Sequence, residues 1–222
     1  MKISVVIPTY EAYGAGVAFL SRLLDSIMNQ SFKDVEIIVS DHSGDNAIAN
    51  FLENKPVVYV RNERMRGSSS ANLNNAIEHS SGDIIKPMFM DDYFHDANAL
   101  SIIHDRFIGG ASWVAVGVDV SDSTHHIKNF IPKWNDRVVF GHNTISSPSA
   151  IAYLRCDLKW DERLIWLMDC KFYRDLYDKF GLPAIEEQVL ITNFLHSKQL
   201  THTMGRERQK MEEDLIRKEY KE

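Results

Sequence analysis

Residues 83–93 read DIIKPMFMDDY, an apolar run that ends in two adjacent acids, Asp91 and Asp92. The run predicts a buried strand over 83–90, because it is short, apolar and follows the break at Ser81-Gly82. Upstream, apolar runs alternate with helical spacing, which predicts strands over 3–7, 35–39 and 57–60 and helices over 15–30, 46–54 and after the capping serines 68–70. This alternation is typical of an α/β fold, a mostly parallel sheet flanked by helices.

The remaining segments complete a single domain. The first strand is expected to end at Pro8, because proline has no N–H to donate to a sheet ladder. Gly109-Gly110 divides two halves of one domain over 1–204. The tail 205–222 is expected to form an exposed charged helix, since opposite charges stand four residues apart in it. The second half is predicted to hold a helix over 97–107, a strand over 113–118, a loop-rich stretch over 119–150 and a helix over 163–180.

Composition excludes several classes of protein. Of 222 residues, 44% are apolar and 25% are charged, which is typical of a globular domain with a sizeable core. The 25 basic and 31 acidic residues give a net charge of −6, which argues against a nucleic-acid partner. Cys156 and Cys170 lack the spacing of a zinc site or a disulfide framework, and no apolar stretch approaches membrane-spanning length. A cytoplasmic protein without a transmembrane segment is therefore expected.

The acid pair Asp91-Asp92 predicts a metal site at the carboxyl edge of the sheet, where ligands bind in such folds. Two adjacent carboxylates repel each other, and a divalent cation between them and a phosphate removes that repulsion. Mg²⁺ and Mn²⁺ prefer such oxygen ligands. The alternative is that the acids cap the helix over 97–107, but Asp96 is better placed for a cap. The metal site is therefore the favoured interpretation.

Asp41 follows the second predicted strand, at the same edge of the sheet. A carboxylate there suits a hydrogen bond to a base or a ribose, as in nucleotide-binding α/β folds. The alternative is an Asx-turn, because the segment 41–45, DHSGD, is turn-forming throughout. The spacing of residues alone favours nucleotide binding and the Asx-turn equally.

Four segments together resemble a known family: VVIPTY at 5–10, EIIVSDHSGD at 36–45, GSSSANLNNAI at 67–77 and SSPSAIAYLR at 146–155. With the acids at 91–92, they resemble the family 2 glycosyltransferases of the GT-A fold. Those enzymes transfer a sugar from a nucleotide-sugar donor, typically with inversion. The resemblance is strong over 1–107 and weaker over 146–181. It implies a nucleotide-binding half over 1–107 and an acceptor-binding half over 108–204.

The resemblance also implies roles for individual residues. Asp92 would hold a Mn²⁺ or Mg²⁺ ion on the donor diphosphate, and Asp169 would be the catalytic base. The alternative for Asp169 is a carboxylate on a helix face, paired with Tyr173 or Lys171. The donor-binding residues would be Pro8, Thr9 and Tyr10 around the base, Asp41 on the base or ribose, Arg66 and Asn74 near the donor, Asp91, and His196 in the segment 196–201 that closes over the diphosphate.

The predicted function is an inverting hexosyltransferase of polysaccharide biosynthesis, using a UDP-sugar and a glycan or lipid-linked saccharide acceptor. His42 and Tyr93 stand where the family carries further acids, so an inactive nucleotide-sugar-binding module is an alternative. A sugar nucleotidyltransferase is less favoured, because residues 9–16 contain no Lys or Arg. The charge-balanced tail gives no support to electrostatic membrane anchoring, so any peripheral association would need a partner. A homodimer is possible through the tail.

Overall fold

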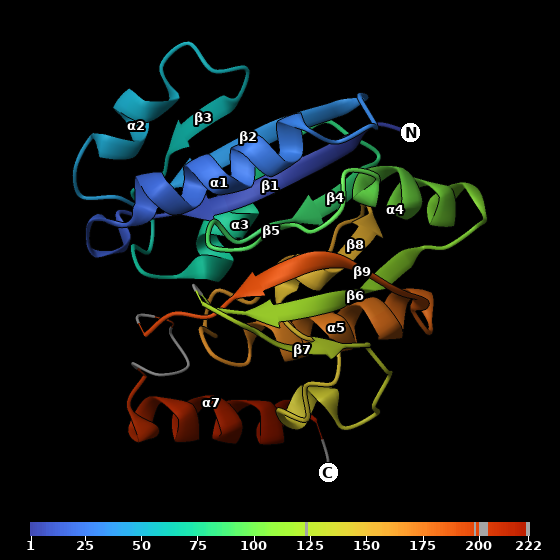
Figure 1. The fold of residues 1–222 in the computed structure, drawn as a ribbon. Helices are drawn as coiled ribbons and strands as arrows, with labels where there is room; N and C mark the ends of the chain where they lie inside the picture. Colours follow the sequence, from blue (N-terminus) through green and yellow to red (C-terminus); the bar gives the residue numbers. More distant parts are fainter. Residues whose placement is uncertain (123, 198, 200–203, 221–222) are drawn as a thin grey trace.

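The chain forms three layers, with one sheet between two layers of helices (Figure 1). A computed structural model describes residues 1–122, 124–197, 199 and 204–220. The strands are β1 (Ile3–Thr9), β2 (Val35–Asp41), β3 (Val58–Arg61), β4 (Ile84–Pro87), β5 (Tyr93–Phe94), β6 (Trp113–Ser121), β7 (His126–Phe130), β8 (Ile151–Leu154) and β9 (Ala184–Phe194). The helices are α1 (Gly16–Met28), α2 (Ala47–Leu52), α3 (Ser69–Glu78), α4 (Ala99–Ile108), α5 (Met168–Phe180) and α7 (Arg206–Glu219), with short 3₁₀ turns η1 (Ala12–Gly14), η2 (Val138–Phe140) and η3 (Pro148–Ala150).

The sheet is mostly parallel, as predicted. Its order is β3-β2-β1-β4-β8-β6-β9-β5, and β7 pairs with β6. The pairs β3/β2, β2/β1, β1/β4 and β6/β9 are parallel, whereas β8, β5 and β7 pair antiparallel with their neighbours. The predicted strand 83–90 is too long, because β4 ends at Pro87. The chain then turns at the two acids and forms the short strand β5.

The prediction that the first strand ends at Pro8 is wrong, since β1 continues to Thr9. Odd-numbered residues of β1 bond toward β2, as in the bond from the His42 N–H to the Thr9 carbonyl. Pro8 is even-numbered and faces β4, whose ladder with β1 ends at the pair Val6/Pro87. The missing N–H of Pro8 therefore removes no ladder bond.

The two faces of the sheet bury different helices. On β1, Ile3, Val5 and Ile7 pack into one cluster with α1, α2 and α4. Val6 points to the opposite face, into the cluster with α3, α5 and α7. This alternation follows from the two-residue period of a strand, and it explains why the parallel strands are apolar throughout.

The seam between β6 and β9 is irregular at Gly117. The register shifts on both sides of this residue, which pairs with Val189. A Cβ atom at Gly117 would lie 2.7 Å from the carbonyl oxygens of both Glu187 and Gln188. Only glycine therefore allows β9 to approach β6 this closely.

The charged tail forms α7, which lies along the second half of the domain beside η2 (Figure 1). Its buried residues are Glu212 and Ile216, and Ile216 packs in the cluster with α5. Within the described ranges, no helix combines the length and apolar character that a membrane crossing needs.

Candidate active site

Three side chains meet where β1, β4 and β9 end. Tyr10 follows β1, Asp91 follows β4 and His196 follows β9. The His196 Nε2 atom lies 2.9 Å from an Asp91 carboxylate oxygen. Burial, and then the nearby Asp91 carboxylate, raise the pKa of Tyr10, whose side chain is still 39% exposed. The predicted donor residues Tyr10, Asp91 and His196 are thus brought together at the carboxyl edge of the sheet, which is the usual ligand edge of an α/β fold.

Arg22 of α1 lies beneath this group. Its Nη2 atom donates a 2.6 Å hydrogen bond to the carbonyl of Asp91. Its guanidinium lies 4.0 Å from the ring centroid of Phe194 and 4.6 Å from that of Tyr93. This cation–π arrangement ties the loop after β4 to the end of β9.

Asp92 is enclosed by protein, with an exposed fraction of 1%. One carboxylate oxygen accepts hydrogen bonds from the Asn193 amide and the Phe194 backbone N–H, at 3.0 and 3.2 Å. The other oxygen accepts one from the Ser147 hydroxyl at 3.2 Å. Burial raises the pKa of Asp92 to about 7. A carboxylate held in this way stabilises the loops around it.

The surroundings of the two acids decide which one fits a metal ion. The Asp91 side chain is 22% exposed, whereas Asp92 is sealed by its hydrogen bonds. The described residues contain no cluster of three or more acids, histidines or cysteines that could hold an ion alone. Mg²⁺ is commonly held by one or two carboxylates together with substrate phosphates. Asp91 presents a partly exposed carboxylate to such a shared site, whereas the Asp92 oxygens accept hydrogen bonds from the protein. The metal site at Asp92 stays a prediction.

Asp169 lies in the first turn of α5 and is partly exposed. One oxygen accepts a 2.7 Å hydrogen bond from the Asn143 amide, and the other accepts one of 2.7 Å from the Cys170 N–H. Burial raises its pKa to about 6 in spite of these bonds. A carboxylate with a raised pKa is suited to accept a proton near neutral pH.

The alternative partners considered for Asp169 are engaged elsewhere. The Tyr173 hydroxyl donates to the carbonyl of Ser146 at 2.9 Å. The Lys171 ammonium binds Asp175, 2.8 Å away on the next turn of α5. Asp169 is therefore not the helix-face carboxylate of that alternative interpretation.

One short loop, residues 143–149, connects Asp92 to Asp169. Asn143 binds Asp169 through its amide nitrogen, and its amide oxygen accepts from the Ser146 N–H at 3.0 Å. Ser147, the next residue, binds Asp92. Ser146 has a φ of +92°, which is rare for a residue other than glycine and persists only where the surroundings enforce it. The loop therefore holds both acids in a fixed relation.

Asp41 is fully buried at the end of β2. Its Oδ1 atom accepts from the N–H and the hydroxyl of Ser43, at 2.9 and 2.5 Å. Its Oδ2 atom accepts from the Tyr59 hydroxyl at 2.9 Å and lies 3.7 Å from Arg61. This geometry is that of the Asx-turn alternative. A nucleotide would have to displace these partners to reach the carboxylate.

The other predicted donor residues have separate environments. The buried Asn74 amide binds the Trp160 backbone, donating to its carbonyl and accepting from its N–H at 2.9 Å each, so this amide is used within the protein. Arg66 lines a different pocket, of about 340 Å³, together with Ser68, Glu162 and Arg208. Pro8 and Thr9 are buried in β1, which leaves Tyr10 as the exposed member of that predicted set.

Sequence reasoning missed Asn143, Ser147, Asn193 and Arg22. The segment 146–155 was noticed as a motif, but no periodicity gives Ser147 a partner 55 residues away. In the predicted segment 196–201, Lys198 and residues 200–201 lie outside the described residues.

A family model described as glycosyl transferase family 2 matches residues 4–159. The matched range contains Tyr10, Asp91 and Asn143 and ends before Asp169. A curated relative from Campylobacter jejuni, "GalNAc(5)-diNAcBac-PP-undecaprenol beta-1,3-glucosyltransferase", is 31% identical over 96 residues. That alignment covers 41% of this chain and 29% of the relative.

Solved structures share the fold at low sequence identity. TarS 1–349 of S. aureus in complex with UDP-GlcNAc superposes with a TM-score of 0.71 at 17% identity, over 92% of this chain and 62% of that one. The complex of TarS 1–349 with UDP superposes with a TM-score of 0.69 at 19% identity, over 89% of this chain and 61% of that one. Mannosyltransferase PcManGT from Pyrobaculum calidifontis, in complex with GDP-Man and Mn²⁺, superposes with a TM-score of 0.57 at 18% identity, over 86% of this chain and 56% of that one. This chain thus spans less than two thirds of each relative, and the likeness confirms the GT-A fold.

Proposed function

The chain belongs to glycosyl transferase family 2, and we propose that it transfers a sugar from a nucleotide-sugar donor to a saccharide acceptor with inversion. One observation carries the proposal: the loop 143–149 binds both Asp169, a carboxylate of raised pKa, and Asp92, the neighbour of the accessible acid Asp91. A UDP-sugar is the favoured donor, because two of the similar structures hold UDP and UDP-GlcNAc.

We propose a lipid-linked saccharide as the acceptor. The curated relative is named for transfer to an undecaprenol-linked glycan, which supports this class over a free sugar. A cytoplasmic location, a role in polysaccharide biosynthesis, a homodimer and association with a membrane through a partner stay predictions. The net charge of −6 gives no electrostatic attraction to anionic lipids.

The donor would lie against Tyr10, Asp91 and His196. The exposed Tyr10 ring offers a stacking surface beside the end of β1. Asp91 is the residue that would hold a divalent ion on the diphosphate, and PcManGT, which shares the fold, is described with Mn²⁺. Such an ion, when bound, offsets the negative charge that grows on the departing diphosphate. His196, 2.9 Å from Asp91, would orient that carboxylate.

Asp169 would take the proton from the acceptor hydroxyl as this hydroxyl attacks the anomeric carbon. Its two hydrogen bonds, from Asn143 and from the Cys170 N–H, fix the direction of the carboxylate. The proposal needs one base and no protein nucleophile, so a single displacement inverts the anomeric centre, by the logic of inverting hydrolases.

A panel of donors tests the proposal. The full chain is incubated with UDP-GlcNAc, UDP-Glc, UDP-Gal and GDP-Man, each with Mn²⁺, Mg²⁺ or EDTA, and release of the nucleoside diphosphate is measured with and without an undecaprenyl-diphosphate-linked saccharide. Metal-dependent release of UDP from one donor, increased by the acceptor, is expected. The anomeric configuration of the product, read by NMR, tests inversion.

Three other outcomes would contradict the proposal. Donor binding in a thermal-shift assay without release or transfer would identify an inactive binding module. Formation of a sugar nucleotide from UTP and a sugar phosphate would identify a nucleotidyltransferase. The absence of any donor binding across the panel would remove nucleotide sugars as ligands.

A further inference from the structure

The turn that leads into α5 is capped by a residue from a different helix. The backbone N–H groups of Ile165, Trp166 and Leu167 precede the first turn of α5, where Lys171 makes an early intrahelical bond to the Leu167 carbonyl. Leu167 is the N-cap residue, and its side chain makes no capping hydrogen bond. The N–H groups of 165–167 come before the helical hydrogen bonds of α5 and have no intrahelical acceptor, and a backbone N–H removed from water needs a partner from elsewhere.

Glu212 of α7 supplies those acceptors. Its Oε1 atom accepts from the Ile165 N–H at 3.0 Å, and its Oε2 atom accepts from Trp166 and Leu167 at 2.9 and 3.0 Å. The side chain is 2% exposed, and Arg208 holds Oε1 through a 2.9 Å ion pair. A buried carboxylate with four donors is fixed in place, because losing any of these bonds would leave it unsatisfied.

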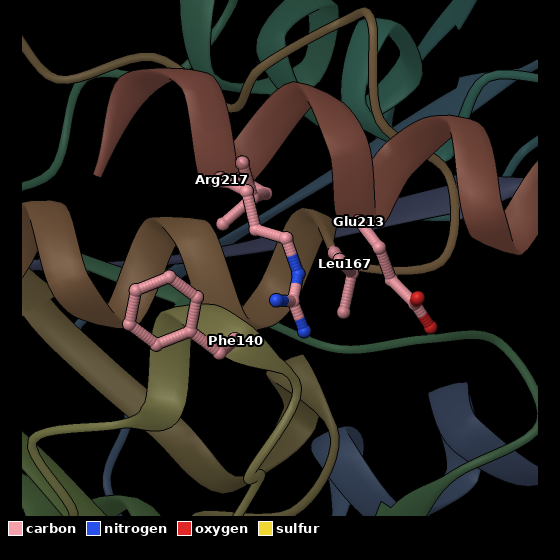
Figure 2. A pocket seen from close by; sticks show the side chains of 5 residues that line it. Phe140, Leu167, Glu213 and Arg217 are labelled. Atoms are coloured by element: carbon pink, nitrogen blue, oxygen red, sulfur yellow. The ribbon is translucent and has the colours of Figure 1, made fainter. Parts of the chain in front are cut away.

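Figure 2 shows how α7 lies over this turn. The side chains of Leu167 and of Phe140 in η2 lie near those of Glu213 and Arg217 of α7, and all four line one pocket. A pocket of about 100 Å³ lies between these side chains. Packing between α7 and the turn is therefore incomplete on this side, and the Glu212 hydrogen bonds supply the specific connection.

We propose that Glu212 is a positioning residue: from α7 it fixes the turn at 165–167 and so sets the direction of Asp169 at the start of α5. The inference rests on the proposed function, since it takes Asp169 as the base. Asp169 is two residues from Leu167, so rotation of this turn would move its carboxylate away from Asn143. Donor contacts at Tyr10, Asp91 and His196 lie on other elements and are left in place.

The test compares Glu212→Gln with Glu207→Gln, the same change at an exposed position of α7. We expect kcat of Glu212→Gln to fall about tenfold while KM for the nucleotide sugar stays within twofold. Amide hydrogen exchange at 165–168 should accelerate at least tenfold in this variant. Glu207→Gln should match the wild type in all three measurements.

A second variant separates positioning from stability. Ile48→Ala removes a buried side chain of α2, in the cluster on the other face of the sheet, and should lower Tm at least as much as Glu212→Gln. We expect its kcat to stay within twofold of the wild type. This result would support positioning, because a loss of stability alone would lower kcat in both variants.

The inference is overturned if Glu212→Gln keeps wild-type kcat or wild-type exchange at 165–168, or if Ile48→Ala lowers kcat as much as Glu212→Gln does. It is also overturned if, in Glu212→Gln, kcat falls and KM for the nucleotide sugar rises to a similar extent. Failure of the proposed function has a different signature, namely normal turnover in Asp169→Asn, whatever the exchange rates of Glu212→Gln.

Discussion

Two aspartates lie at the same edge of the sheet but differ in burial and in hydrogen bonding. Asp41, after β2, has both oxygens bound by Ser43 and Tyr59 and is fully buried. Asp91, after β4, is partly exposed, and one of its carboxylate oxygens lies 2.9 Å from His196. Strand-end position is therefore not sufficient to identify a ligand-binding acid. The difference lies in how many protein donors already occupy each carboxylate.

The number of protein donors bound to the carboxylate also distinguishes Asp91 from its neighbour Asp92. By the same measure, Asp169 lies between them. Asp92 resembles Asp41, since its oxygens are used within the protein. Asp169 is intermediate, because two hydrogen bonds direct it but it is still partly exposed. Open acids are expected to affect activity when mutated, and enclosed acids are expected to affect stability. Substitution of each kind of acid tests this division.

The largest effect is expected for Asp169→Asn. Removal of a general base lowers rates about 10²–10⁴-fold, so we expect kcat to fall about 1,000-fold with little change in donor affinity. Asp178→Asn, on the same helix but paired with Arg174, is the control and should stay within twofold. Steady-state kinetics with a donor and acceptor would check both, and near-normal turnover of Asp169→Asn would remove it from the mechanism.

Asp41→Asn should affect folding. The substitution leaves Arg61 without its carboxylate partner and disturbs the Tyr59 bond, at an expected loss of about 2 kcal/mol in the free energy of unfolding. Urea unfolding measures this loss, with the exposed Asp34→Asn as a control near zero. If Asp41 binds the nucleotide instead, the folded variant will lose donor affinity more than tenfold with little loss of stability.

The adjacent acids provide a matched pair. Asp91→Asn should weaken binding of the nucleotide sugar about tenfold in Mn²⁺ and leave binding in EDTA nearly unchanged, since Asp91 presents the accessible oxygen. Asp92→Asn should mainly lower Tm. Titration calorimetry with and without the ion distinguishes them. A larger loss of metal-dependent affinity in Asp92→Asn would return the metal site to Asp92.

The smallest expected effect concerns pH. The pKa of Asp169 is about 6 in the folded protein and about 3.9 when unfolded. The base is active when deprotonated, so kcat/KM should rise with pH up to about 6 and then level off. Cys170 and Tyr173 are the titratable groups nearest to it, and burial raises the pKa of each.

The raised pKa of Asp169 also makes the stability of the folded protein depend on pH. A raised folded pKa means that folding becomes less favourable as pH rises from about 4 to about 6. Two pKa units correspond to at most about 3 kcal/mol, and the partial exposure of Asp169 reduces the expected effect. Asp169→Asn should therefore be more stable than the wild type by about 1 kcal/mol at pH 7.5, and nearly equal to it at pH 4. Thermal unfolding at the two pH values checks this. A gain in stability at pH 4 as large as that at pH 7.5 would contradict the assignment of the pKa.

Local patterns predicted much of the first half of the fold. Helices α1 and α3 and strands β2 and β3 depend on apolar spacing and capping serines, which are visible within a few residues. Strand β5 has two residues, and β7 is exposed except at Phe130, so neither has an apolar pattern to find. Pro8 was misjudged because its effect depends on which neighbour its missing N–H would face.

The site was harder to predict, for a related reason. Asp91, Asp169 and His196 could be named because their types and order match a family pattern. Their accessibility depends on donors far along the chain, such as Asn193 for Asp92 and Asn143 for Asp169. From the sequence, Glu212 is one of several charged residues on a helix that is predicted to be exposed. Its contact with residues 165–167 is visible only in the folded structure.

The missing side chain of Gly117 has a consequence for how the protein tolerates mutation. Any other residue there would push β9 from β6, because its Cβ atom would lie 2.7 Å from two carbonyl oxygens. β9 carries Asn193 and Phe194, which hold Asp92. In a saturation scan, position 117 should therefore appear as intolerant as a catalytic residue, although it has no functional group. A map of mutational sensitivity would mark the scaffold of the site as strongly as its chemistry.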